Sequence, residues 1–291
     1  MTSDPPARPA GALGRRALIG SGLLLAVAVG LANALNAVFQ FALARILDRD
    51  EYALLAALFA VVLIGAVPPL AFQATTAREV ASSLAGGRSA EAGLLLRATL
   101  RSVFVWTVGL LVLSAIVVPV AAAAGLPHPL AIGATLATIA IALAVPVALG
   151  GLQGAHRFSE LSAAHVLFAG TRLAAGLAIG LAGGGVGAVM LGVAAATAVT
   201  TLVSLLPLRD LLGLARGLAL PRRGLVTLPN AGAAVALAAL TALSTLDILV
   251  AKLTLPGGKA GDYAAASVGA RVLLLIPIAV TTVLFPHVAT L

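Results

Sequence analysis

Residues 98–122 read ATLRSVFVWTVGLLVLSAIVVPVAA, and the only charged residue in this stretch is Arg101, near its start. A helix needs about 20 apolar residues to cross the roughly 30 Å of hydrocarbon in a bilayer. The stretch is therefore long enough and apolar enough to form a transmembrane helix. Its apolar residues follow one another continuously instead of alternating with polar ones, which argues against a strand of a membrane barrel.

The same pattern recurs along the whole chain. Of the 291 residues, 61% are hydrophobic and 10% are charged, whereas a water-soluble domain carries about 25% charged residues. Hydropathy predicts eight spans, at about residues 17–43, 53–74, 98–122, 130–151, 162–182, 186–207, 230–251 and 263–285. We therefore predict an all-α fold, a polytopic transmembrane helical bundle.

Several other classes of protein are disfavoured by the same sequence. The net charge of +8 does not indicate nucleic-acid binding, because the basic residues lie in short segments between apolar runs and form no stripe. The chain has no cysteine, which excludes disulfides and thiolate metal ligands. The histidines lack metal-ligand spacing: His128, His156, His165 and His287. We predict no metal, no cofactor and no catalytic residue.

The distribution of basic residues predicts the orientation of the chain. Cytoplasmic segments of membrane proteins carry an excess of Lys and Arg. With the N-terminus inside, twelve basic residues fall on the cytoplasmic side: Arg8, Arg15, Arg16, Arg78, Arg88, Arg97, Arg101, Arg157, Arg209, Arg216, Arg222 and Arg223. Only four fall outside: Arg45, Arg49, Lys252 and Lys259. The N-terminus is therefore predicted to be cytoplasmic, and with eight spans so is residue 291.

Residues 39–77 and 246–289 resemble each other. Residues 39–45 read FQFALAR and residues 246–252 read LDILVAK, and each segment leads into an acidic residue followed by Tyr-Ala, at 51–53 and at 262–264. The two acidic landmarks, Glu51 and Asp262, are 211 residues apart, with six spans between them. Because six is even, both copies enter the membrane in the same direction, which predicts a parallel repeat of the kind known in transporters.

This repeat predicts how the chain is organised. Residues 1–16 form a cytoplasmic tail, residues 17–207 a six-helix lobe, residues 208–229 a cytoplasmic linker, and residues 230–291 the first two helices of a second lobe. The linker mixes leucine with arginine, so that it either joins the lobes or also lies along lipid headgroups. A protein with this plan has two six-helix lobes, so we expect the chain to be a fragment that stops after its eighth helix.

The residues of the repeat also resemble a known family. The stretches 36–47 (NAVFQFALARIL) and 51–56 (EYALLA) are similar to the opening of bacterial polysaccharide and O-antigen flippases, which belong to the multidrug/oligosaccharidyl-lipid/polysaccharide exporter superfamily. In the second copy, residues 246–252, GDYAAAS at 261–267 and LFP at 284–286 look like the seventh and eighth helices of that family. These residues cover about a quarter of the chain.

The resemblance implies a function that composition alone does not. It implies a pair of lobes with alternating access, in the bacterial cytoplasmic membrane, that moves polyprenyl-pyrophosphate-linked oligosaccharide to the outer leaflet. Partners would be this lipid-linked substrate, the bilayer, and glycosyltransferases or a polymerase of the same pathway. The chain departs from the family in lacking most of the second lobe and in having few charged residues within its spans.

Charged residues inside the predicted spans are the first candidates for a binding site, because each costs about 2.5–3.5 kcal/mol to insert. Arg172 lies in the fifth span, Asp247 in the seventh and Arg271 in the eighth. Two arginines facing a wet cavity would attract pyrophosphate, because guanidinium donates paired hydrogen bonds to phosphate oxygens. Alternatively, Arg271 and Asp247 form an ion pair between neighbouring helices and only stabilise packing.

Uncharged polar residues form a second candidate group. Asn33, Asn36 and Gln40 are spaced i, i+3 and i+7, which places them on one stripe of the first helix. They either line the cavity and bind sugar hydroxyls or hydrogen-bond to a neighbouring helix, an interaction worth about 0.6 kcal/mol on average in membranes.

Two other functions are weighed against the flippase. The first is cation antiport by a multidrug-extrusion transporter, which requires acidic residues in the cavity, and Asp247 is the only acid within a predicted span. The second is a non-transporting scaffold or enzyme of polysaccharide synthesis, which would show acidic or histidine clusters in its loops. The one acidic cluster, Asp48, Asp50 and Glu51, fits a solvated connection better than a site.

Overall fold

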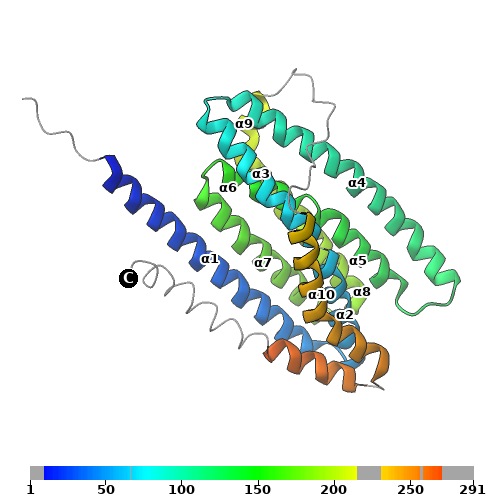
Figure 1. The fold of residues 1–291 in the computed structure, drawn as a ribbon. Coiled ribbons are helices and arrows are strands. Elements are labelled where there is room, and N and C mark those ends of the chain that lie inside the picture. Colours follow the sequence, from blue (N-terminus) through cyan, green and yellow to red (C-terminus); the bar gives the residue numbers. More distant parts are fainter. Residues whose placement is uncertain (1–9, 66, 215–230, 256–257, 271–291) are drawn as a thin grey trace, which may run out of the picture.

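The computed structural model describes residues 10–65, 67–214, 231–255 and 258–270, and every regular element in these ranges is a helix (Figure 1). The helices, in chain order, are α1 (Ala10–Ile46), α2 (Arg49–Gly65), α3 (Val67–Ala85), α4 (Ser89–Ala123), α5 (Pro129–Ala142), α6 (Val145–Gly154), α7 (Phe158–Leu181), α8 (Val186–Leu205), the short 3-10 helix η1 (Leu206–Leu208), α9 (Arg209–Leu214), α10 (Ala231–Thr254) and a helical segment at 259–270. The predicted all-α bundle is confirmed.

Five helical stretches of the described chain are long and apolar enough to cross a membrane. They are Gly20–Ile46, Ser89–Ala123, Pro129–Gly154, Phe158–Leu181 and Val186–Leu214. Each of them contains or largely covers one of the predicted spans. The predicted span at 53–74 instead falls across the boundary between α2, which ends at Gly65, and α3, which begins at Val67.

Two spans depart from a regular transmembrane helix: one is unusually long and the other is broken in the middle. α4 has 35 residues, about 52 Å at 1.5 Å per residue, so its first turns extend beyond a hydrocarbon core of about 30 Å. The span Pro129–Gly154 consists of α5 and α6, which are separated at Leu143 and Ala144. Pro146 follows this break, and since proline has no N–H it cannot continue the ladder of helical hydrogen bonds.

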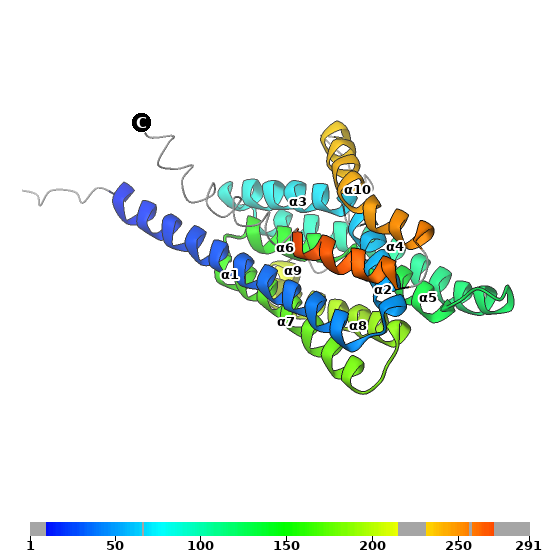
Figure 2. The ribbon, with the colours of Figure 1, turned by 90° about the horizontal axis from the view of Figure 1, so that it is seen from below.

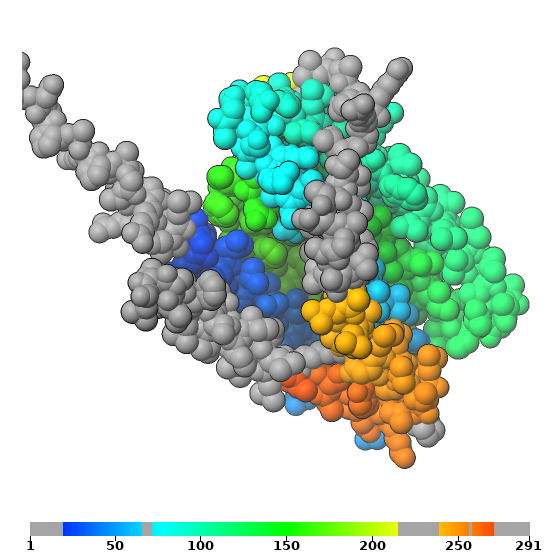
Figure 3. Space-filling view, viewed as in Figure 1, coloured from blue at the N-terminus to red at the C-terminus, as the bar shows by residue number. Residues whose placement is uncertain are grey.

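The surface of the bundle is apolar and its interior contains hydroxyl groups. Trp106 of α4 is 70% exposed, and its neighbours Phe104 and Val105 are exposed as well. The segment that contains them forms part of the surface at the right of Figure 3. In contrast, Thr138 and Thr197 are buried and donate to carbonyls of their own helices. An apolar surface of this extent is stable in lipid and not in water, which confirms a multi-pass membrane protein.

Glycines set the closest contacts between helices. α1 runs along α7, as both Figure 1 and Figure 2 show, and Gly176 of α7 packs directly against the ring of Phe39. α6 packs on α3, where a Cβ on Gly150 would lie 2.6 Å from the carbonyl oxygen of Gln73 and one on Gly154 would lie 2.5 Å from that of Ala77. These glycines let α1 pack closely on α7, and α6 pack closely on α3.

The first part of the predicted linker is a packed element of the lobe. Leu208 and Leu211 are buried in a cluster with Val80 and Leu161. Asp210 of α9 also pairs with Arg157, which precedes α7. Residues 208–214 are therefore held against the cytoplasmic end predicted for the lobe, and the rest of the predicted linker, 215–229, lies outside the described residues.

The segment predicted to be the second copy of the repeat packs against the first segment. α10 corresponds to the predicted span at 230–251 and lies against α2 and α3 (Figures 1 and 2). Ile248 and Ala264 join the buried cluster of Tyr52 and Leu55. The predicted eighth span is described only as far as residue 270.

Candidate functional site

Arg172 lies near the middle of α7 and faces α1. Its Nη2 donates a hydrogen bond to Oδ1 of Asn36. Its guanidinium carbon lies 5.1 Å from the ring centroid of Phe39, 5.3 Å from that of Phe59 and 5.7 Å from that of Phe168. We call Asn36 and these three phenylalanines, together with Arg172, the arginine cage; its members come from α1, α2 and α7.

The cage stabilises the cation without an anion. A guanidinium over an aromatic face is attracted by the ring quadrupole, by about 2 kcal/mol or more when it is desolvated. In the part of the chain that the structure describes, no carboxylate lies within 4.0 Å of Arg172. Its Nε is buried and has no hydrogen-bond partner among these residues. The cage therefore retains an unused donor, and its net positive charge is uncompensated locally.

The packing of α1 on α7 explains why these residues meet. Phe39 is fully buried, and its ring fits against Gly176, one turn beyond Arg172. Phe39 and Phe59 pack edge to face, with their centroids 5.5 Å apart and their planes at 82°. The glycine removes the side chain that would otherwise separate the two helices, so the arginine can reach Asn36 and both rings.

The three polar residues predicted on one stripe of α1 have different environments. Asn36 binds Arg172, as described above. Gln40 is partly buried, and its Oε1 is a buried acceptor without a hydrogen-bond partner among the described residues. Asn33 is exposed on the outside of the described fold. The stripe thus runs from the exterior at Asn33 to the cage.

Asp247, the acid predicted within the seventh span, is bound by hydroxyl groups of the following helix. The Tyr263 hydroxyl lies 3.3 Å from its Oδ2, and the Ser267 hydroxyl donates to the same oxygen at 2.9 Å. The proposed partner Arg271 lies outside the described residues. The alternative ion pair between Asp247 and Arg271 stays a prediction.

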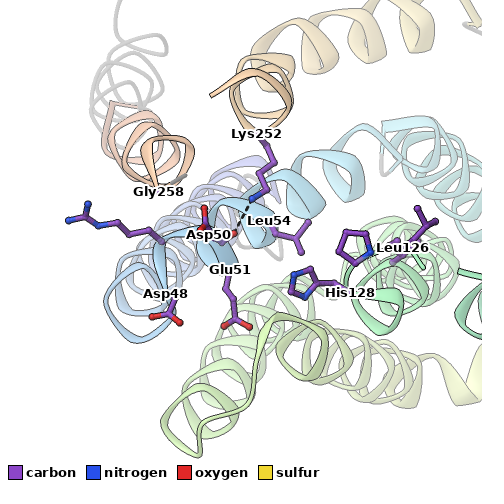
Figure 4. Close-up of a pocket in the computed structure, with 11 residues that line it drawn as sticks. Asp48, Asp50, Glu51, Leu54, Leu126, His128, Lys252 and Gly258 are labelled. Atoms are coloured by element: carbon purple, nitrogen blue, oxygen red, sulfur yellow. Dashed lines mark hydrogen bonds between the residues drawn. The ribbon is translucent and has the colours of Figure 1, made fainter. Parts of the chain in front are cut away.

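A charged basin of about 1060 Å³ lies at the end of the bundle that the sequence predicts to be outside (Figure 4). Three connections surround it: the one between α1 and α2, the one between α4 and α5, and the one that follows α10. Its polar lining consists of Asp48, Arg49, Asp50, Glu51, His128 and Lys252. The acidic cluster that the sequence assigned to a solvated connection is thus part of a basin with mixed charge.

A smaller cavity lies inside the bundle. A cavity of about 190 Å³ between α6, α7 and α8 is lined by His165, Thr200, Thr201 and Ser204. Within the described ranges, no group of three or more His, Cys, Asp or Glu side chains is arranged to hold a metal. His287 lies outside these ranges.

Sequence reasoning identified the charged member of the arginine cage but missed its aromatic walls. Phe39, Phe59 and Phe168 look like ordinary apolar residues of a membrane span. One signal was available, because Phe168 lies four residues before Arg172, on the same face of a helix. The partners of Asp247 had a clearer signal, since Tyr263 belongs to the repeated acid-Tyr-Ala landmark.

Comparison with known proteins gives one similarity in three dimensions. No protein-family model matches the sequence, and no curated protein sequence matches it. A solved structure described as the inward-facing conformation of a multidrug resistance MATE family transporter of the MOP superfamily is similar, with a TM-score of 0.49 and 17% sequence identity. The similarity covers 86% of this chain and 59% of that one, so the chain spans less than two thirds of that transporter's length.

Proposed function

We propose that this chain is part of a membrane transporter that moves polyprenyl-pyrophosphate-linked oligosaccharide across the cytoplasmic membrane by alternating access. The observation that carries the proposal is the arginine cage, a cation inside an apolar bundle with no carboxylate within ion-pair distance in the described chain. An intramembrane arginine of this kind is expensive to insert, and function is the usual reason for one.

The chemistry of the cage suits a phosphate. Arginine offers five donors in a planar fork that matches phosphate oxygens. In Arg172 one of these donors, Nε, has no partner among the described residues, and another is held by the neutral amide of Asn36. A pyrophosphate supplies the missing negative charge, and the exchange of a neutral amide for an anion strengthens the hydrogen bond.

The amide side chains beside the cage suit the sugars of the same substrate. Asn33 is exposed, although it lies in an apolar helix. An amide facing lipid would lose its hydrogen bonds, which favours a wet cavity on this side of α1. In the proposed transporter, Asn33 and Gln40 bind sugar hydroxyls, and Arg271, outside the described residues, is the second phosphate ligand.

The proposal is tested by substitution of the cage arginine. The protein is reconstituted in vesicles, and the transfer of a fluorescent polyprenyl-pyrophosphate disaccharide between leaflets is measured. Arg172→Ala is expected to lower transfer at least tenfold with unchanged protein level, and Arg172→Lys to retain part of it, because lysine keeps the charge but loses the planar fork.

The matched control is Arg101→Ala, which removes an exposed arginine from α4 and should leave transfer unchanged. Arg271→Ala is measured in the same assay and should behave like Arg172→Ala. Wild-type rates of transfer in both the Arg172→Ala and the Arg271→Ala proteins would contradict the pyrophosphate site.

A second function, multidrug-type cation antiport, is favoured by one observation. Asp247 holds two hydroxyl donors on one carboxylate oxygen, within a predicted span. A carboxylate at this depth can pair with an organic cation. Under this alternative, vesicles would transport an organic cation such as ethidium, Asp247→Asn would abolish that transport, and the lipid-linked disaccharide would not move.

A further inference from the structure

The two copies of the repeat meet at one end of the bundle through a small set of contacts. The side chain of Lys252, at the end of α10, donates to the backbone carbonyl of Asp50 at 3.2 Å. Arg49 forms an ion pair with Asp262, with Nη1 and Oδ2 separated by 3.6 Å. We call these four residues, together with Gly258 and Gly261, the clasp.

Glycines allow the clasp to close at the level of the backbone. A Cβ on Gly258 would lie 2.8 Å from Cδ of Arg49 and 3.0 Å from its Cβ. A Cβ on Gly261 would overlap the carbonyl oxygen of Arg49 and lie 3.2 Å from its Cα. At Gly261 the start of α2 and the helix at 259–270 therefore touch without an intervening side chain, so that a larger residue at this position would separate the two segments.

The clasp joins equivalent parts of the repeat. Arg49 and Asp50 immediately precede the landmark Glu51-Tyr52, and Gly261 and Asp262 lead into the matching Tyr263. The topology predicted from the basic residues places both connections on the outer side. The contact is therefore one between the two predicted lobes, at the predicted outer end.

Four of the six clasp residues also line the charged basin. Arg49, Asp50, Lys252 and Gly258 form one side of it, and the connection between α4 and α5, with Leu126 and His128, forms the opposite side (Figure 4). Separation of α10 from α2 at the clasp would therefore widen the basin toward the interior of the bundle, between the two copies.

The polar bonds of the clasp are of a kind that can open. The side chains of Arg49 and Asp262 are 75% and 61% exposed, and exposed ion pairs are weak because water screens them. The hydrogen bond of Lys252 goes to a backbone carbonyl at an exposed position. Neither interaction involves a desolvated charge, so water replaces both partners readily when the copies separate.

We propose that the clasp is the outer gate of this protein: closed as observed here, and opened by separation of α10 and the 259–270 helix from the start of α2. The gate rests on the proposed transport by alternating access and deepens it, because it names the contact that must break before a substrate leaves on the outer side. The ion pair between Arg49 and Asp262 sets the balance between the closed and the open form.

The gate is tested by a distance measurement that needs neither substrate nor transport. The chain has no cysteine, so spin labels can be attached at Leu181→Cys, at the end of α7, and at Leu253→Cys, on α10. These side chains are 74% and 84% exposed. Pulsed electron paramagnetic resonance on the protein in nanodiscs then reports the distance between the end of α7, in the first predicted lobe, and α10, in the second.

Arg49→Glu in the labelled protein replaces attraction to Asp262 by repulsion. The expected result is an increase of at least about twofold in the ratio of long to short distances. The exchange Arg49→Glu with Asp262→Arg restores the pair and should return the wild-type distribution. Arg88→Glu is the matched control, because the ion pair of Arg88 with Glu91 lies within the first predicted lobe and its loss should change no distance.

An unchanged distribution in Arg49→Glu, or a failure of the exchanged pair to reverse the change, would overturn the gate. A cross-link separates this outcome from failure of the transport proposal. With Arg49→Cys and Gly258→Cys, the two Cβ positions are close enough for a disulfide after a small adjustment. Oxidation should block transfer of the lipid-linked disaccharide, and reduction should restore it.

Full transfer by the oxidised protein would show that the clasp stays closed during transport, which overturns the gate and leaves the transport function intact. Absence of transfer in the wild-type protein, together with the expected changes in distance, would instead overturn the transported substrate and leave the gate intact.

Discussion

At the scale of single residues, the bundle contains polar atoms that its own packing does not satisfy. The buried atoms without a hydrogen-bond partner among the described residues are Gln40 Oε1, Tyr52 Oη, Ser162 Oγ and Arg172 Nε. A buried polar group left unpaired costs about 1–3 kcal/mol. For Arg172 and Gln40, a bound substrate that supplies the missing hydrogen-bond partner would explain why these atoms are unpaired. Tyr52 is 2% exposed and belongs to the apolar cluster around Phe39, where no such explanation applies.

Tyr52 and its counterpart in the second copy therefore respond differently to loss of the hydroxyl. Tyr52→Phe removes an unpaired group, so we expect an unchanged or higher midpoint of thermal unfolding. Tyr263→Phe removes a hydrogen bond to Asp247 and should lower the midpoint, because Asp247 loses one donor. Both midpoints are measured by tryptophan fluorescence in detergent, and a clearly lower midpoint for Tyr52→Phe would mean that its hydroxyl has a bound partner.

At the scale of helices, small residues decide which pairs of helices pack most closely. Gly150 and Gly154 are spaced i, i+4 on α6, and both abut carbonyl oxygens of α3. Gly176 and Gly180 have the same spacing on α7 and abut Phe39, Leu43 and Ile46 of α1. Without apolar driving force between helices in lipid, close van der Waals contact of this kind holds them together.

The close contact of α6 with α3 predicts that a methyl group added at Gly150 lowers the stability of the protein. In Gly150→Ala the added Cβ would lie 2.6 Å from the Gln73 carbonyl oxygen, and because a backbone atom cannot move aside alone, we expect a loss of about 1–3 kcal/mol in the free energy of unfolding. Gly170→Ala is the control: it meets no atom within 4 Å and gains helix propensity. Denaturant unfolding in detergent measures both, and equal effects would contradict the predicted overlap.

At the scale of the whole molecule, charge and hydropathy act together. The apolar exterior requires a bilayer, and the basic residues outside the spans select the orientation in it. Arg78, Arg88 and Arg97 lie at the same end of the described lobe as the packed segment 208–214, while the charged basin lies at the other. This asymmetry is the basis for assigning the clasp to the outer side.

The orientation is tested by labelling single cysteines in intact cells. A membrane-impermeant maleimide should label Leu126→Cys, in the connection between α4 and α5, without permeabilisation. It should label Ala90→Cys, at the start of α4, only after permeabilisation. The 291-residue sequence has no cysteine, so the protein without these substitutions serves as the unlabelled control. The reverse pattern would invert the predicted topology and place the clasp inside.

The sequence by itself determined that this chain is a helical membrane protein and where most of its spans lie. It also predicts that residues 39–77, from the end of α1 onward, are repeated at 246–289. These properties depend on local composition and on spacing along the chain, which no packing can change. Arg172 was recognisable for the same reason, since a charge in an apolar run is visible without a structure.

Only the tertiary structure decided what surrounds these residues. Phe39, Phe59 and Phe168 surround Arg172 because α1, α2 and α7 converge there, and Arg49 meets Asp262 across more than 200 positions of sequence. Apolar residues carry no signal of their partner when every span is apolar. In a bilayer the choice of partner is made by close packing and by a few polar bonds, and both exist only once the helices are assembled.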